Sequence, residues 1–226
     1  SCVLAHPDIT TDMGFQRVEA VVAHEYFHNY SGNRVTCRDW FQLSLKEGFT
    51  VFRDSEFSAD MNSRGVKRVE DALFLRTHQF AEDAGPLAHP VRPDAFMDIS
   101  NFYTLTVYEK GAEVVRMLHT LLGADAFYAG TKLYFERFDG QAVTCDDFVD
   151  SLAEASGRDL EQFRRWYEQP GTPEVAFEEH YDAAEQRYSL TLRQHNPLTS
   201  NQRDSAPLVI PVAVGLLVDG RAVPLA

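Results

Sequence analysis

The chain has 226 residues, of which 44% are hydrophobic and 24% are charged, a composition that is typical of globular proteins and excludes a disordered or low-complexity chain. Its net charge of −13 argues against a nucleic-acid backbone or an anionic membrane surface as a binding partner. The sequence contains no apolar run of the roughly 20 residues that a membrane-spanning helix needs.

The three cysteines, Cys2, Cys37 and Cys145, are sparse and have no CxxC spacing. They do not form the framework of a disulfide-rich domain, and reduced thiols predict a cytoplasmic location. No signal peptide is visible in the first residues, and there is no initiator Met. We therefore expect this sequence to be a fragment of a longer protein, with any targeting signal outside it.

Apolar residues at helical spacing predict a long helical region in the first part of the chain. The predicted helices cover residues 15–30, 40–60, 66–84, 108–122, 124–138 and 160–168. Thr144 opens a further helix, with Asp147 placed three residues later as in a capping box. Between the third and fourth helices, residues 85–98 contain three prolines, which predict an extended loop.

The pattern changes at Gln169-Pro170-Gly171. Residues 175–177, 188–192 and 208–212 are rich in strand-forming side chains and are separated by polar turns. So few strands cannot bury both faces of a sheet. We predict a mainly α fold with two parts, a helical region over residues 1–169 and the beginning of a β-sandwich domain over residues 170–226.

His24, Glu25 and His28 form an HExxH motif inside the first predicted helix. At about 100° per residue, positions i and i+4 lie on the same helix face, so both imidazoles can reach one metal ion. Glu25 lies about 100° away from His24 around the axis, which suits a general base acting on a metal-bound water better than a ligand.

Catalytic zinc sites usually have three protein ligands and one open position. Glu47, on the second predicted helix, is the candidate for the third ligand, because a turn between the two helices aims it back at His24 and His28. This His₂Glu set predicts a hydrolytic zinc site. The alternative is a pair of surface histidines beside a helical glutamate.

Cysteine and the other histidines offer weaker candidates for metal binding. Cys37 as a fourth ligand would make the site structural, although a small buried thiol is the simpler interpretation. The remaining histidines show no ligand spacing and are read as structural or exposed: His6, His78, His89, His119, His180 and His195.

Several strings of residues resemble one known family, the gluzincin zinc aminopeptidases of the bacterial aminopeptidase N type. These strings lie along most of the chain, at His24–Asn29, Gly32–Thr36, Lys46–Gly48, Val51–Asp54, Tyr103–Val114, Asp139–Ala142 and Phe163–Tyr167. The resemblance implies the helical part of a thermolysin-like zinc metallopeptidase catalytic domain, followed by the β domain that comes next in this family.

The resemblance also implies a function, and it adds one residue role to that of Glu25. The expected activity is zinc-dependent removal of N-terminal residues from peptides by a water that one zinc ion activates. Glu25 would act as the general base, and Tyr108 matches the family tyrosine that stabilises the transition state. From the residues alone, Tyr108 is one of nine tyrosines and core packing is its default reading.

One feature of the family is missing here. Its Gly-x-Met-Glu-Asn motif, which binds the amino group of the substrate, lies upstream of HExxH and is expected outside this sequence. The alternatives therefore stay open: a zinc hydrolase of other specificity, such as an endopeptidase or epoxide hydrolase, or a catalytically inert zinc-binding fragment. The partners we expect are peptides, without nucleic acid or membrane, and the oligomeric state is not predicted.

Overall fold

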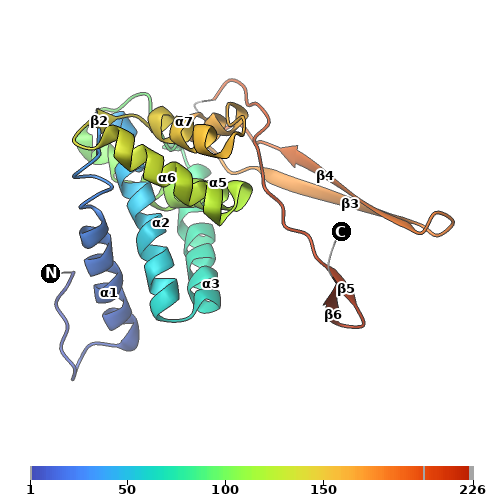
Figure 1. Ribbon diagram of the computed structural model, residues 1–226, viewed down its shortest axis with the longest axis horizontal. Helices are drawn as coiled ribbons and strands as arrows, with labels where there is room; N and C mark the ends of the chain where they lie inside the picture. Colours follow the sequence, from blue (N-terminus) through green and yellow to red (C-terminus); the bar gives the residue numbers. More distant parts are fainter. Residues whose placement is uncertain (1, 201, 224–226) are drawn as a thin grey trace.

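The computed structural model describes residues 2–200 and 202–223. It consists of a helical part followed by strands that extend from it (Figure 1). The α-helices are α1 (Asp12–Phe27), α2 (Leu43–Met61), α3 (Arg64–Phe74), α4 (Phe80–Asp83), α5 (Gly111–Leu122), α6 (Ala124–Phe138), α7 (Cys145–Ser156) and α8 (Arg165–Glu168). The described helices include none long and apolar enough to cross a membrane. The mainly α prediction is confirmed.

Shorter elements connect these helices. The 3₁₀ turns are η1 (Trp40–Gln42), η3 (Ile99–Phe102) and η5 (Gln162–Arg164), and the π-helical turns are η2 (Leu75–Gln79) and η4 (Thr106–Lys110). The strands are β1 (Thr36–Cys37), β2 (Ala142–Val143), β3 (Glu174–Asp182), β4 (Arg187–His195), β5 (Leu216–Val218) and β6 (Arg221–Val223).

Side-chain caps set several helix ends. Helix α1 starts at Asp12 rather than at residue 15, because the Thr11 hydroxyl accepts a hydrogen bond of 3.2 Å from the backbone N–H of Gly14. Helix α7 begins after Thr144, whose hydroxyl and backbone form a reciprocal capping box with Asp147, as predicted.

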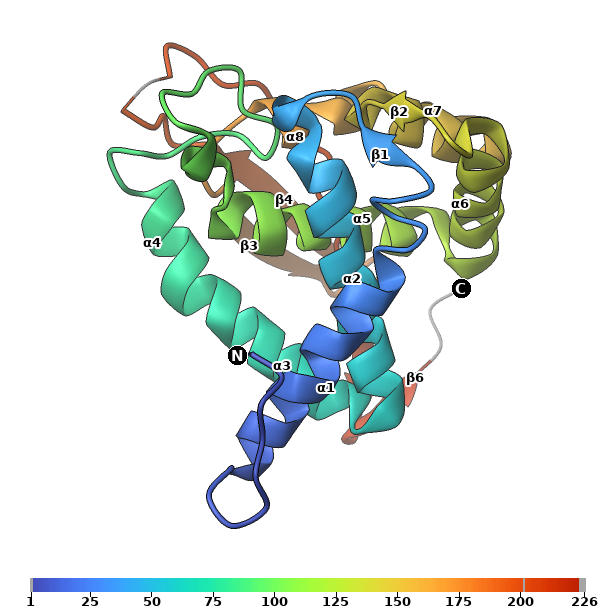
Figure 2. The ribbon, with the colours of Figure 1, turned by 90° about the vertical axis from the view of Figure 1, so that its left-hand side faces the viewer.

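Helix α2 is the centre of the helical part and has eleven buried residues. Helices α1 and α3 lie beside it, and α5 crosses it (Figures 1 and 2). Both helices have a glycine where they cross, Gly48 on α2 and Gly111 on α5. A Cβ atom on Gly48 would lie only 2.9 Å from the backbone carbon of Gly111, which is too close. Next to it, the Ser44 hydroxyl donates to the Val107 carbonyl at 2.8 Å. This close approach brings η4 against α2.

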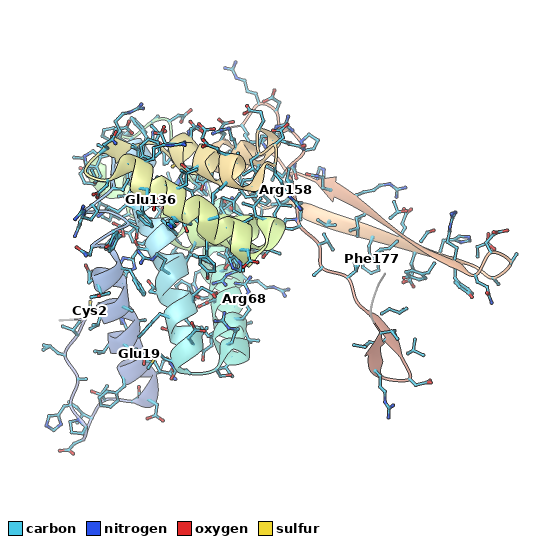
Figure 3. The ribbon with its side chains drawn as sticks, in the orientation of Figure 1. Cys2, Glu19, Arg68, Glu136, Arg158 and Phe177 are labelled. Carbon is cyan, nitrogen blue, oxygen red and sulfur yellow. The ribbon has the colours of Figure 1, made fainter. Side chains whose placement is uncertain are left out.

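The C-terminal region holds an exposed hairpin. Strands β3 and β4 pair antiparallel over nine residues each, with Glu174 opposite His195, and they project away from the helices (Figure 1). Almost every residue of the hairpin is exposed, including Phe177 (Figure 3). This leaves the two strands without a covering layer among the described residues.

The prediction of a strand over residues 208–212 is wrong. The backbone of this segment is hydrogen-bonded by side chains and not by a neighbouring strand. The Gln194 side chain bonds both the N–H and the C=O of Leu208, and the Trp166 indole donates to the Val209 carbonyl at 2.7 Å. Leu208 is buried against the helical core. The segment is therefore an extended anchor on the helices, and the pairing strands β5 and β6 come later in the chain.

Candidate metal centre

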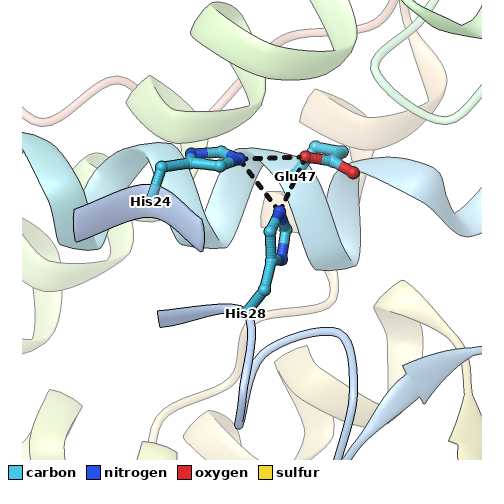
Figure 4. A group of neighbouring side chains, drawn as sticks. All are labelled: His24, His28 and Glu47. Atoms are coloured by element: carbon cyan, nitrogen blue, oxygen red, sulfur yellow. Dashed lines mark hydrogen bonds and ion pairs between the residues drawn. The ribbon is translucent and has the colours of Figure 1, made fainter. Parts of the chain in front are cut away.

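Two adjacent helices bring three potential metal ligands together. His24 and His28 lie one turn apart on α1, and Glu47 faces them from α2 (Figure 4). The two Nε2 atoms are 2.9 Å apart, and a Glu47 carboxylate oxygen lies 3.3 Å from His24 and 3.2 Å from His28. The third ligand suggested by sequence is therefore within reach of the histidine pair.

The hydrogen bonds on the far side of each imidazole determine which nitrogen carries the proton. His24 Nδ1 is 2.7 Å from the Asp54 carboxylate, and His28 Nδ1 is 2.9 Å from the Ser31 carbonyl. Both acceptors require Nδ1 to be the donor, which leaves Nε2 with a lone pair in the neutral ring. Two nitrogen lone pairs and a carboxylate oxygen then point at the same small volume.

Such a convergence fits a cation. Ligand atoms bound tetrahedrally to zinc at about 2.0–2.1 Å lie about 3.3–3.4 Å from one another. The observed separations of 2.9, 3.3 and 3.2 Å are close to that spacing. Three lone pairs so close together repel one another unless a positive charge or a proton lies between them, so the donor set suits a divalent ion with imidazole and carboxylate ligands.

The electrostatics of the site reflect this convergence. Burial lowers the pKa of His24, but its bonds to Asp54 and Glu47 outweigh that effect and raise the pKa to about 9. Burial raises the pKa of Glu47, yet hydrogen bonds from His24, His28 and Lys46 bring it well below its usual range. Glu47 is therefore ionised at neutral pH.

Glu25 and Tyr108 complete the set of site residues predicted from the sequence. Glu25 follows His24 on α1 and is exposed, and it is not one of the three converging residues. Tyr108 lies on η4 and packs against the small cluster of Leu43, Phe102 and Val107. Burial and the neighbouring Glu47 raise the pKa of the Tyr108 phenol, so it stays protonated and can donate a hydrogen bond.

A cavity of about 550 Å³ adjoins the centre. Its walls include His24, Val51, Asp54, Tyr108 and Glu109. Of the three ligands, His24 lines this hollow, whereas His28 and Glu47 are buried behind it.

Sequence reasoning missed the residues that orient the ligands. Asp54 lies seven positions after Glu47, which is two turns along the same face of α2, and that spacing is the signal that points to it. The side chain of Arg53 donates to the Phe27 carbonyl at 3.0 Å and to the Ser31 hydroxyl at 3.0 Å, which fixes the end of α1. The contacts to Ser31 had no signal in the sequence.

The weaker candidate for a metal ligand in the sequence is Cys37. Among the described residues, the group able to hold a metal contains His24, His28 and Glu47 but not Cys37. Cys37 is half-buried on β1, where desolvation raises the pKa of its thiol. It behaves as a packed thiol rather than as a ligand.

Comparison with known proteins identifies the family. Residues 1–167 match the model of the peptidase family M1 domain, and residues 171–225 match a domain of unknown function (DUF3458) with an Ig-like fold. Aminopeptidase N of Escherichia coli (strain K12) is 56% identical over 224 residues, which cover 99% of this chain and 26% of that protein. Aminopeptidase N of Caulobacter vibrioides is 62% identical over 184 residues, which cover 81% of this chain and 21% of that protein.

A solved structure gives the same result. The crystal structure of Legionella pneumophila aminopeptidase A in complex with aspartic acid matches with a TM-score of 0.77 and 34% identity, over 86% of this chain and 22% of that one. The chain spans about a quarter of the length of the two aminopeptidases N named above. The match of its first 167 residues shows that the chain belongs to peptidase family M1.

Proposed function

We propose that the protein containing this chain is a zinc-dependent aminopeptidase that hydrolyses N-terminal residues from peptides. The observation that carries the proposal is the convergence of His24, His28 and Glu47, with ligand atoms 2.9–3.3 Å apart beside an exposed Glu25. Relatives at 56% and 62% identity that carry the name aminopeptidase N support the same activity.

Zinc is the metal that the donor set favours, because two imidazoles and one carboxylate leave a position open for catalysis. His24 Nε2, His28 Nε2 and a Glu47 oxygen would hold it, and Asp54 and the Ser31 carbonyl orient the two rings. When bound, the ion supplies Lewis acidity that polarises the scissile carbonyl and acidifies water.

The remaining steps belong to residues of the chain. Glu25 is exposed next to His24 and would take the proton of the attacking water and pass it to the leaving amine. The protonated phenol of Tyr108 would donate a hydrogen bond to the oxygen that becomes negative in the transition state. Lys46 bonds the second oxygen of Glu47 at 2.8 Å, which keeps that carboxylate in place.

Two further expectations stay proposals. We place the boundary between the helical region and the β-sandwich domain at residues 169–170, and the end of one family match at residue 167 and the start of the next at residue 171 support it. We also propose a cytoplasmic location, which the free thiols of Cys2, Cys37 and Cys145 support.

The experiment that tests the activity compares substrates with free and blocked amino termini. The full-length protein should release chromogen from an aminoacyl-chromogen and leave its N-acetylated form intact. Cleavage of the acetylated substrate, or of internal peptide bonds alone, would indicate a zinc hydrolase of another specificity.

The role of Glu25 is tested separately. Glu25→Gln removes the base and should lower kcat by at least about a hundredfold while the zinc content stays unchanged. Glu19→Gln is the matched control, since Glu19 lies on the same helix, more than one turn before His24 (Figure 3), and should leave kcat unchanged. Full activity of Glu25→Gln would contradict the mechanism.

A further inference from the structure

Two consecutive acidic residues hold both ends of the short turn that carries Tyr108. At the first residue of η4, the Glu82 carboxylate accepts hydrogen bonds from the backbone N–H of Thr106 at 2.8 Å and from its hydroxyl at 2.5 Å. At the last residue, the Lys110 ammonium donates to the Asp83 carboxylate at 2.7 Å. Tyr108 lies midway between these two attachments.

The second attachment also reaches the start of the Ig-like domain. Asp83 accepts from the Gly171 N–H at 3.2 Å and from the Thr172 hydroxyl at 3.1 Å. Lys110 donates to the Gly171 carbonyl at 2.8 Å. Gly171 is the first residue of the match to the Ig-like family model, so one ion pair joins three segments: the end of α4, the end of η4 and the beginning of the next domain.

This ion pair is deeply buried. The side chain of Asp83 is 1% exposed and that of Lys110 is 8% exposed. Buried charges are costly unless every polar group finds a partner, and here the carboxylate and the ammonium each have more than one. Because both charged groups are bonded on more than one side, the network restrains the backbone at Lys110.

The turn itself needs restraint from outside. A π-helical turn is rare as a local structure, and η4 has only five residues. In its middle, the Ser44 hydroxyl donates to the Val107 carbonyl, and the Val107 N–H donates to the Thr104 hydroxyl at 3.2 Å. Glu82 and Asp83 bond its two ends, at Thr106 and Lys110. The N-cap residue of the turn, Leu105, provides no side-chain cap hydrogen bond of its own.

We propose that Glu82 and Asp83 are positioning residues for Tyr108, and that the Asp83–Lys110 pair ties the placement of this phenol to the docking of the chain at Gly171. The inference rests on the proposed function, in which Tyr108 acts on the transition state. Loss of the pair should then lower kcat more than it raises KM, because a displaced phenol weakens an interaction made only in the transition state.

The test is a double-mutant cycle in the full-length protein. Asp83→Asn alone leaves the Lys110 charge buried, so the informative variant is the neutral pair Asp83→Asn with Lys110→Met, made with and without Tyr108→Phe. We expect the neutral pair to lower kcat by about tenfold when Tyr108 is present and by less than about twofold in the Tyr108→Phe background. Zinc content should stay the same in all four proteins.

Independent effects would overturn the proposal. If the neutral pair lowers kcat by the same factor in both backgrounds, or leaves kcat unchanged when Tyr108 is present, the pair does not act through the phenol. Asp146→Asn is the matched control. Asp146, on α7, also forms an ion pair, with Arg92 at 2.6 Å, but it has no bond to η4. It should leave the ratio of kcat to KM unchanged.

The same cycle separates this inference from the proposed function. If Tyr108→Phe alone lowers kcat while the neutral pair acts independently of it, only the positioning role is wrong. If Tyr108→Phe leaves kcat unchanged, the role of Tyr108 in the proposed mechanism is wrong, and the positioning role is overturned with it.

Discussion

His24 Nδ1 and the Asp54 carboxylate are joined by a hydrogen bond of 2.7 Å between α1 and α2. In this bond Nδ1 carries the proton and donates it to Asp54. The ring is therefore oriented with the Nε2 lone pair facing His28 and Glu47. Asp54 is on the same helix as Glu47, so α2 supplies one ligand directly and orients another. The geometry of the centre therefore depends on how α1 and α2 pack.

Replacing Asp54 should weaken metal binding. Asp54→Asn keeps an acceptor for His24 but loses the negative charge that makes the ring a better ligand, so zinc affinity should fall about 10- to 100-fold. Competition with a chromogenic chelator measures this affinity. Asp60→Asn is the control, because Asp60 lies on the same helix but its side chain is 69% exposed. Unchanged affinity in Asp54→Asn would contradict the role given to Asp54.

Adding one methyl group at the crossing of α2 and α5 should destabilise the protein. In Gly48→Ala the new Cβ would lie 2.9 Å from the backbone of Gly111 and 2.6 Å from the Ser44 hydroxyl. The helices would have to move apart, at a cost of about 1–3 kcal/mol in the free energy of unfolding. Thermal unfolding followed by circular dichroism measures the loss.

The control for that substitution is Gly65→Ala on α3. An added Cβ there meets nothing within 4 Å, so only helix propensity changes. The free energy of unfolding should rise by up to about 1 kcal/mol. If both alanine variants shifted stability in the same direction, close packing at Gly48 would not be the cause.

Local rules predicted much of this chain. The placement of His24 and His28 on one helix face follows from the spacing of HExxH alone, and the capping box at Thr144 follows from three adjacent residues. Glycine lowers the helix propensity at position 48, but the structure shows why it is needed there, since Gly111 packs against it.

The rest depends on contacts distant in sequence. The bond between Lys110 and Asp83 spans 27 residues and that between Lys110 and Gly171 spans 61, and no periodicity in the sequence predicts either. The π-helical turn η2 lies inside the helix predicted over residues 66–84, and η4 overlaps the start of the helix predicted over residues 108–122. The failed strand at residues 208–212 has the composition of a strand, and side chains from the helical part and from β4 determine its actual course.

Glu109 should make stability depend on pH. Burial is the largest of the effects that raise the pKa of its carboxyl to about 7. The charges of Asp54, Asp71 and Glu113 also raise this pKa, whereas that of Lys67 lowers it. A raised carboxyl pKa means that the folded state binds more protons than the unfolded state between about pH 4.5 and 7, so stability falls as pH rises through that range.

Glu109→Gln removes this ionisation. It should raise the free energy of unfolding by about 2 kcal/mol at pH 8 and change it little at pH 4.5. Chemical denaturation at the two pH values, with equal zinc content, measures the difference. Glu70→Gln, an exposed position on α3, is the control and should show no comparable gain at pH 8. Equal gains for Glu109→Gln at both pH values would show that ionisation of Glu109 is not responsible.

The convergence of His24, His28 and Glu47 on one ion is tested most directly by anomalous diffraction at the zinc absorption edge, on crystals of the full-length protein. We predict one strong peak at about 2.0–2.2 Å from His24 Nε2, His28 Nε2 and a Glu47 carboxylate oxygen. A zinc peak elsewhere, or a peak at the histidines with Glu47 turned away from it, would contradict the account.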